Sequence, residues 1–465
     1  MPDSLTLHKK AQVFEHDLFA RFCLDGQILC KLKNPTPEFP FVAYNMPDDA
    51  YMTGMMTAAF SFKYAVTGDP EDKKTVSLLL RGLDRLCRAS GKTGLLARAW
   101  WPLDNPDFME GGHDWHVNEA MNLRWNGDVS TDQMDGVFFG FYFAYKLAAD
   151  EEEKALIARR VSELTDALIE NDFRIIDVDG EMTAWGNYTI EHLLREEHLH
   201  GLLLLQHLKI AAHVTGDAKY GAFYREFAVE RRLADYTVMA WRPVPPPFSN
   251  HSDNVMHIME LLPLLDLETD PALYALYLQG LRVLSRGYGG EDIALPDGTT
   301  PYEFFERFFM TSDLGIPESM KAFMVSAVKG FWAGNPLRQG IRETGTPIFN
   351  FAFTHYFDEA EDDIPITAKD TLRLFPLRIK MNPDTIAKYE AQFGFAYDPA
   401  PRSPAPGDEA PIPVDRRRKD WSAWVQNPYT EPADGPDDLI WEFNGHDYLF
   451  GYWMGRMFGF VGADE

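Results

Sequence analysis

The chain has 465 residues, of which 45% are hydrophobic and 14% aromatic, so it can bury a large core and is not mostly disordered. It carries 71 acidic against 44 basic residues, a formal net charge of −27. That charge disfavours nucleic acid and anionic membranes as partners, because like charges repel.

The sequence shows no run long enough for a transmembrane helix and no apolar core of a signal peptide near its start. We therefore expect a cytoplasmic location by default, or a periplasmic or secreted one if the chain is trimmed. The three cysteines, Cys23, Cys30 and Cys87, lack metal-ligand spacing. No Gly-rich phosphate loop or nucleophile-elbow serine motif occurs, so we expect no cofactor, and the oligomeric state is not indicated.

Apolar residues recur with helical spacing along most of the chain, in pairs of segments joined by short polar turns. Very apolar segments alternate with amphipathic ones, which is typical of an inner and an outer ring. The sequence therefore predicts an all-α fold, an α/α toroid of six or seven helical hairpins. The predicted helices cover residues 4–22, 45–64, 70–90, 137–149, 151–172, 191–215, 219–234, 255–265, 271–285, 347–357 and 446–460.

Other segments break this pattern. Residues 174–186 have a turn at Asp179-Gly180 and predict a minor β hairpin. We expect a single toroid domain over residues 1–465, with a lid-like insertion at 286–345. Residues 398–420 are rich in proline and predict a strap that covers the body.

Residues 107–147 are where we expect a functional site. Their first half is polar and aromatic, and their second half is apolar nearly all the way round, which predicts a buried helix capped by Ser130 or Thr131. A polar loop that leads into the start of a buried helix is typical of the floor of a binding cleft. We expect Trp115, Asp128 and His251 to share one sugar-sized basin at such helix starts.

Short motifs distributed over most of the chain carry a family resemblance. They are Tyr51-Met-Thr-Gly, Tyr64-Ala-Val-Thr-Gly-Asp, Gly94-Leu-Leu-Ala-Arg98, Gly127-Asp-Val-Ser-Thr-Asp-Gln, Asp177-Val-Asp-Gly with Trp185-Gly186, Asn250-His-Ser-Asp and Tyr452-Trp-Met-Gly-Arg456. In these motifs the chain resembles a group of bacterial α/α-toroid carbohydrate-active proteins, akin to toroidal polysaccharide lyases of the glucuronan and alginate type. The resemblance implies polysaccharide degradation by β-elimination at a uronic acid.

In such lyases an Asn and a His or Arg neutralise the substrate carboxylate, and a Tyr removes the C5 proton. The resemblance implies His251 as the histidine and Asn187 or Asn118 as the asparagine. Relatives tend to carry a tyrosine where this chain has Phe353, so Tyr188 or Tyr302 is the predicted base.

Two alternatives stay open. Asp128 and Asp132 lie four residues apart around a helix start, with Asp48 and Asp49 at another, and paired carboxylates of different pKa are what a glycoside hydrolase needs. N-capping explains the same placement without catalysis. The other alternative is a toroid that binds glycans without cleaving them.

Candidate sugar-binding residues combine aromatic rings, which stack on sugar faces, with charged and polar groups. They are Asp49, Tyr51, Arg98, Trp101, His113, Trp115, His116, Arg124, Trp125, Trp185, Asn250 and Asp253. His113 and His116 flank Asp114, a pattern that permits a metal ion, but spacing marks no third ligand. We therefore expect sugar contact there and no metal, with a merely structural loop as the alternative.

Overall fold

The computed structural model describes a large part of the chain. It comprises residues 5–38, 40, 42–45, 47–105, 114–189, 192, 198–239, 251–286, 303, 306–307, 310–311, 317–334, 341–357, 366–398, 403–405, 407, 410–425, 428–429 and 440–465.

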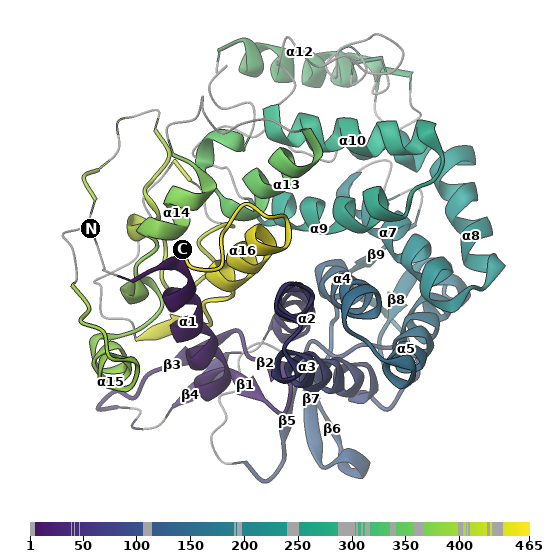
Figure 1. The fold of residues 1–465 in the computed structure, drawn as a ribbon. Helices are drawn as coiled ribbons and strands as arrows, with labels where there is room; N and C mark the ends of the chain where they lie inside the picture. Colours follow the sequence, from purple (N-terminus) through teal and green to yellow (C-terminus); the bar gives the residue numbers. More distant parts are fainter. Residues whose placement is uncertain are drawn as a thin grey trace.

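A closed ring of helices forms the centre of the fold (Figure 1). Its members are α2 (Asp49–Thr67), α4 (Thr131–Leu147), α7 (His198–Thr215), α9 (Ser252–Leu267), α13 (Pro347–Phe357) and α16 (His446–Met457). Each contacts the next, and α16 contacts α2, which closes the ring. These helices carry apolar residues on nearly all sides, so they are stable only where other helices surround them.

A second layer of helices packs around this ring (Figure 1). It consists of α1 (Leu7–Arg21), α3 (Pro70–Arg88), α5 (Glu151–Glu170), α8 (Ala218–Arg225), α10 (Pro271–Arg286) and α14 (Ala368–Leu374). Each inner helix from α2 to α13 contacts the outer helix that follows it along the chain, and α16 contacts α1, so the described residues contain six pairs of one inner and one outer helix. The predicted all-α toroid with minor β structure is confirmed.

The two Thr-Gly-Asp turns mark the change from an inner to an outer helix. Gly68 and Gly216 follow α2 and α7 with φ of 64° and 69°, left-handed values that glycine adopts at little cost. Asp69 and Asp217 then accept hydrogen bonds from the first turns of α3 and α8, at 2.9 Å each. The same three residues therefore end one helix and begin the next.

Several elements differ from the sequence prediction. The helix predicted over 219–234 is broken into α8, a π-helical turn at Glu226–Glu230 and a 3-10 stretch at Leu233–Met239. Two further helices, α12 (Glu318–Gly334) and α15 (Pro383–Phe393), stand apart from the hairpin pairs, and α12 is drawn outside α10 in Figure 1. The lid role of 286–345 and the strap role of 398–420 stay predictions.

Short antiparallel sheets decorate the toroid. The predicted hairpin is present as β8 (Arg174–Ile176) and β9 (Met182–Asn187). The others are β1 (Cys23–Leu24) with β2 (Gln27–Ile28), a sheet in the order β10 (Trp441–Phe443), β3 (Lys31–Lys33), β4 (Ala43–Asn45), and a sheet in the order β5 (Ala99–Pro102), β7 (Leu123–Asn126), β6 (Trp115–Asn118).

Helices α2 and α4 touch through their backbones. A Cβ atom on Gly54 would lie 1.9 Å from the Gly136 carbonyl oxygen, and one on Gly140 would lie 2.5 Å from the Gly54 oxygen. Only glycine fits such positions, since no real Cβ contact is that short. This close approach brings the N-terminal ends of the two helices, at Asp48 and Asp132, side by side.

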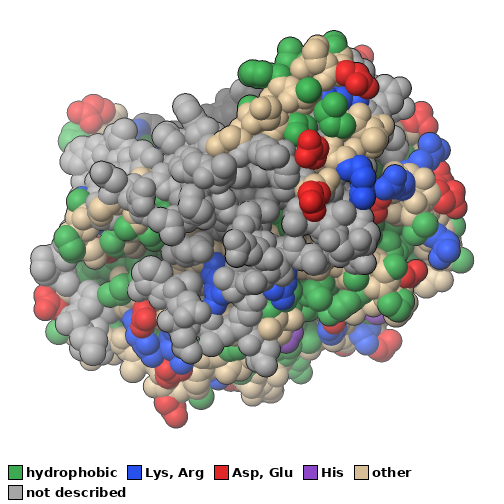
Figure 2. Space-filling model, turned by 90° about the horizontal axis from the view of Figure 1, so that it is seen from above, with side chains coloured by type: hydrophobic (Ala, Val, Ile, Leu, Met, Phe, Trp, Pro, Cys, Tyr) green, Lys and Arg blue, Asp and Glu red, His purple; other side chains and the backbone are tan. Residues whose placement is uncertain are grey.

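The described surface carries charges of both signs. On the face shown in Figure 2, Asp and Glu side chains lie next to Lys and Arg side chains along the described part of the rim. The net charge of −27 is therefore not gathered into one patch of the described residues on that face. Within the described ranges, no helix has both the length and the apolar character needed to cross a bilayer.

Candidate functional site

A cavity of about 440 Å³ opens where inner helices begin. The first turns of α2, α4, α9, α13 and α16 all contribute to its lining, and the positive ends of helix dipoles favour negative groups there. Its described lining comprises Asp48, Tyr51, Met52, Met55, Arg98, Ser130, Thr131, Asp132, Trp185, Ser252, Asp253, Val255, Met256, Ile348, Trp421, Ser422, Trp424, Val425, His446 and Phe450.

Two carboxylates meet on one side of this cavity. The side-chain amide nitrogen of Gln133 donates to Asp48 at 3.1 Å and to Asp132 at 3.5 Å. The amide oxygen of Gln133 accepts a bond from the backbone N–H of Tyr51 at 3.1 Å, which fixes the amide nitrogen toward the acids. The two carboxylates therefore lie close together, because both accept a hydrogen bond from the same amide nitrogen.

The environment of Asp48 favours its protonated form. Burial, together with the neighbouring charge of Asp132, raises its pKa to about 6, although Arg98 partly offsets both. The side chain is still 18% exposed, so it can meet a ligand. A carboxyl group that exchanges its proton near neutral pH is suited to general acid–base catalysis.

Arg98 joins the two helix starts. Its guanidinium donates to the carbonyl oxygens of Pro47 at 3.1 Å and Asp128 at 2.6 Å, and to the Ser130 hydroxyl at 3.0 Å. One guanidinium nitrogen lies 3.8 Å from the Asp48 carboxylate. The Ser130 hydroxyl in turn donates to Asp132. Ser130 is the N-cap of α4, as predicted, but it makes no side-chain capping bond.

Tryptophans provide the apolar part of the lining. Trp185, on β9, is 63% exposed, which is unusual for so large an apolar side chain. Trp421 and Trp424 follow the predicted strap, and Trp424 is fixed by a 2.7 Å bond from its indole N–H to the Asp447 carbonyl oxygen. Sequence analysis missed both of these tryptophans. Their only signal was the Trp-Ser-Ala-Trp spacing.

The described residues proposed for a lyase, Asn118, Asn187, Tyr188 and His251, lie outside the cavity lining. Tyr188 has no exposed surface, its hydroxyl bonds His207 at 3.1 Å, and burial raises its pKa well above the usual value. Asn187, at the end of β9, accepts a bond from the backbone N–H of Thr189 at 3.0 Å. His251 is 7% exposed, and burial holds its pKa at about 3, so its imidazole is neutral.

The expected common basin of Trp115, Asp128 and His251 does not match the structure, because none of the three is in the cavity lining. Trp115 lies on β6, and the Asp128 carboxylate accepts a bond from the backbone N–H of Ala184 at 2.7 Å. Side-chain direction is the cause: Asp128 has a φ of 48°, and its carboxylate faces the β8–β9 hairpin.

The other candidates divide into two groups. Tyr51, Arg98, Asp132, Trp185 and Asp253 line the cavity. The rest of the described candidates do not: Asp49 is fully buried and accepts a bond from the Cys30 backbone N–H at 2.8 Å, and Trp101, Arg124, Trp125 and His116 belong to the β5–β7–β6 sheet. His113, Asn250 and Tyr302 lie outside the described residues.

Comparison with known proteins adds little to this geometry. No protein-family model matches the chain, and no curated protein sequence matches it. Among solved structures, one described as "Crystal structure of D-mannose isomerase" is similar, at 14% sequence identity and a TM-score of 0.34. The match covers 70% of this chain and 85% of that chain. A likeness this low carries no argument about chemistry.

Proposed function

We propose that this protein is a carbohydrate-active enzyme that hydrolyses a glycosidic bond in the central cavity. The observation that carries the proposal is the pair Asp48 and Asp132, held side by side by Gln133 at the starts of two inner helices. Asp48, whose pKa is raised to about 6, is the general acid. Asp132, which lies in the first turn of α4, is the partner carboxylate.

The reaction needs one group to protonate the leaving oxygen and another to attack the anomeric carbon. Inverting glycosidases separate their carboxyl groups by roughly 6.5–9.5 Å to admit a water, whereas retaining enzymes hold them about 5–5.5 Å apart. Asp48 and Asp132 share one hydrogen-bond donor, which favours the shorter arrangement. We therefore expect Asp132 to form a glycosyl-enzyme intermediate, which water cleaves while Asp48 accepts the proton, with retention of configuration.

The charge and shape of the cavity favour a neutral sugar. The described lining contains one arginine, Arg98, and no lysine, against the aspartates Asp48, Asp132 and Asp253. The Arg98 guanidinium is already bound by two carbonyl oxygens and a hydroxyl, so it is poorly placed to neutralise a uronate. The exposed face of Trp185 suits the apolar face of a pyranose ring.

Elimination at a uronate, which the family resemblance implies, has less support. Its predicted base, Tyr188, has no exposed surface, and a raised pKa makes the tyrosine harder to ionise. His251 is nearly buried and neutral. A non-catalytic glycan-binding protein has no need of a carboxyl group with a pKa of about 6 beside a second carboxylate.

The test is to incubate the protein with neutral and uronate-containing oligosaccharides and to follow both new reducing ends and the ultraviolet absorption of unsaturated uronates. Hydrolysis yields reducing ends without that absorption. Asp48→Asn should lower kcat by roughly 10²- to 10⁴-fold, the usual contribution of a general acid.

Asp49→Asn is the matched control. Asp49 is the neighbouring residue, burial raises its pKa well above the usual value, and its carboxyl faces Cys30 instead of the cavity, so the neutral amide is a close replacement. The control should keep wild-type activity. Ultraviolet absorption that disappears in His251→Ala would establish elimination instead, and saturable sugar binding without any product would leave only the binding role.

A further inference from the structure

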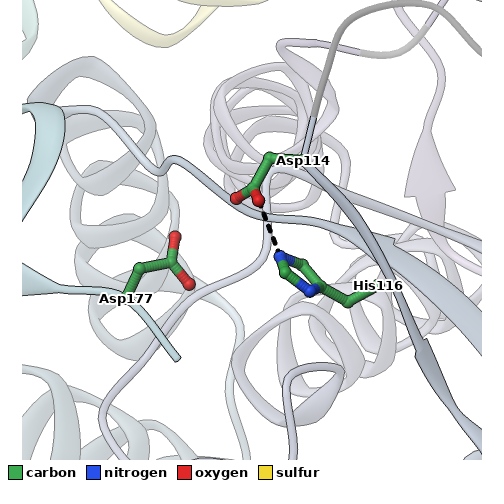
Figure 3. A group of neighbouring side chains, drawn as sticks. All are labelled: Asp114, His116 and Asp177. Carbon is green, nitrogen blue, oxygen red and sulfur yellow. Dashed lines mark hydrogen bonds and ion pairs between the residues drawn. The ribbon is translucent and has the colours of Figure 1, made fainter. Parts of the chain in front are cut away.

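A second cluster of polar side chains lies outside the cavity, between the β5–β7–β6 sheet and the turn that follows β8. Asp114 directly precedes β6, His116 lies on β6, and Asp177 follows β8 (Figure 3). One ligand atom from each of the three lies within 4.8 Å of the other two. Figure 3 shows the Asp177 carboxylate on the side opposite His116, with Asp114 between them.

The protein holds each of these side chains in place. The imidazole of His116 stacks on Trp125, with ring centroids 4.6 Å apart, and its Nε2 lies 2.8 Å from Asp114 Oδ1. Asp177 is 6% exposed and accepts bonds from the backbone N–H groups of Asp128 at 2.8 Å and Val178 at 2.6 Å. Side chains fixed before binding lose little entropy when they ligate an ion.

The two carboxylates converge over one glycine. A Cβ atom on Gly127 would lie 2.1 Å from Asp114 Oδ2 and 3.0 Å from Asp177 Oδ2. A residue with any side chain would therefore push at least one carboxylate away. Glycine at this position allows two acids from different parts of the chain to approach a shared point.

Lysine and arginine side chains of the described residues do not balance the charge of this cluster. Among the described residues, neither carboxylate forms an ion pair with a lysine or an arginine, and the partner of Asp114 is the His116 imidazole, through a hydrogen bond. The nearby Lys92 ammonium donates instead to the carbonyl oxygens of Ile176 and Asp177, at 3.0 and 2.9 Å. Two carboxylates this close repel each other unless a positive charge lies between them.

We propose that Asp114, His116 and Asp177 bind a divalent transition-metal ion, Zn²⁺ or Mn²⁺. One imidazole nitrogen and two carboxylate oxygens form a ligand set that these ions accept, with water completing the coordination. The ion fastens the β8–β9 hairpin to the β5–β7–β6 sheet. Trp185 on β9 lines the cavity, so the ion also sets the position of that ring. The assignment of the metal site does not rest on the proposed hydrolysis.

The experiment is a calorimetric titration of chelator-treated protein with Zn²⁺, Mn²⁺ and Ca²⁺. We expect Zn²⁺ or Mn²⁺ to bind at one equivalent, and His116→Ala and Asp177→Asn each to weaken binding at least tenfold. Asp179→Asn is the matched control: it is an exposed aspartate in the same turn, and binding should be unchanged. Amide hydrogen exchange of residues 174–187 should slow when the ion is added to the wild type.

Three results would overturn the assignment. They are the absence of saturable binding of Zn²⁺ and Mn²⁺, binding that His116→Ala leaves unchanged, and Ca²⁺ as the only ion bound. His116 is partly exposed on its strand, so its truncation should leave the fold intact, and circular dichroism checks this. Loss of binding in that variant with an unchanged spectrum supports the site.

Discussion

Replacing Asp48 by asparagine should make the protein more stable at alkaline pH while it lowers kcat. Burial and the charge of Asp132 raise the pKa of Asp48 to about 6 in the folded chain, whereas an unfolded aspartate titrates near 4. Below pH 4 both states hold the proton. As the pH rises, the unfolded chain releases its proton first, so the contribution of Asp48 to stability is complete below pH 4 and is lost as the pH passes about 6.

The size of the effect follows from the difference between the two pKa values. A difference of about two corresponds to about 3 kcal/mol, since one pKa unit is worth about 1.4 kcal/mol. The amide group that Asp48→Asn introduces would carry no charge at any pH, and its oxygen would still accept the bond from Gln133. We therefore expect the free energy of unfolding of Asp48→Asn to be up to about 3 kcal/mol higher than that of the wild type at pH 8. At pH 4 the two proteins should have the same free energy of unfolding.

Urea unfolding of both proteins at several pH values measures this difference. Asp104→Asn, the same change at an exposed position, is the control and should leave stability unchanged at every pH. A gap between Asp48→Asn and the wild type that does not widen from pH 4 to pH 8 would refute the reasoning. So would a wild type that is the more stable protein at pH 8, because Asp48 would then be stabilised in its charged form.

Three further predictions concern packing, binding and a buried ion pair. Gly136→Ala should lower the free energy of unfolding by roughly 3 kcal/mol or more, because the new Cβ would lie 2.6 Å from an α2 Cα atom. Gly221→Ala, which has open space around it, should raise that free energy by about 0.4–1 kcal/mol, and urea unfolding compares the two variants. Trp185→Ala should raise KM about five- to tenfold at constant kcat in steady-state kinetics, the effect of about 1–1.4 kcal/mol of lost stacking. Lys380→Met should lower the free energy of unfolding by about 3–5 kcal/mol in the same assay, because it removes the ammonium group that lies 3.1 Å from the fully buried Asp447 carboxylate. A loss of stability below about 1 kcal/mol would contradict this.

The helical ring could be predicted because its signal is local. Each inner helix is apolar on most sides, and the Thr-Gly-Asp turns end one helix and cap the next, so pattern and turn chemistry agree. The small sheets other than β8–β9 gave no such signal. Strand β10 pairs with β3, for instance, with Trp441 opposite Lys33, and a strand of three residues has too few positions to show alternation.

The candidate site was predicted in part. Tyr51, Arg98, Asp132, Trp185 and Asp253 were chosen for residue type and nearness to a helix start, and the toroid brings such starts together. The direction of a side chain depends on backbone torsion and packing, which spacing does not contain. This is why Asp128, in a left-handed conformation, faces the hairpin.

The metal-binding hypothesis illustrates the same limit. Sequence spacing showed His116 and Asp114 near each other, but no third ligand. Asp177 reaches them because the turn after β8 is bonded to the backbone of Asp128, just beyond β7, and because Gly127 leaves room for both carboxylates. A ligand set assembled from two separate hairpins has no fixed spacing along a chain.

Asp48 also shows how capping and catalysis can be told apart where the sequence allows both. In the outer layer, Asp69, Asp150 and Asp217 stand at helix starts and accept bonds from first-turn N–H groups at 2.9, 3.0 and 2.9 Å. Asp48 has the same position before α2 but makes no side-chain capping bond. A carboxylate that accepts such bonds is already occupied by the backbone of its own helix, so it is not free to meet a substrate. Because Asp48 does not cap α2, its proton is available to a substrate, and Asp48→Asn changes chemistry without removing a helix cap.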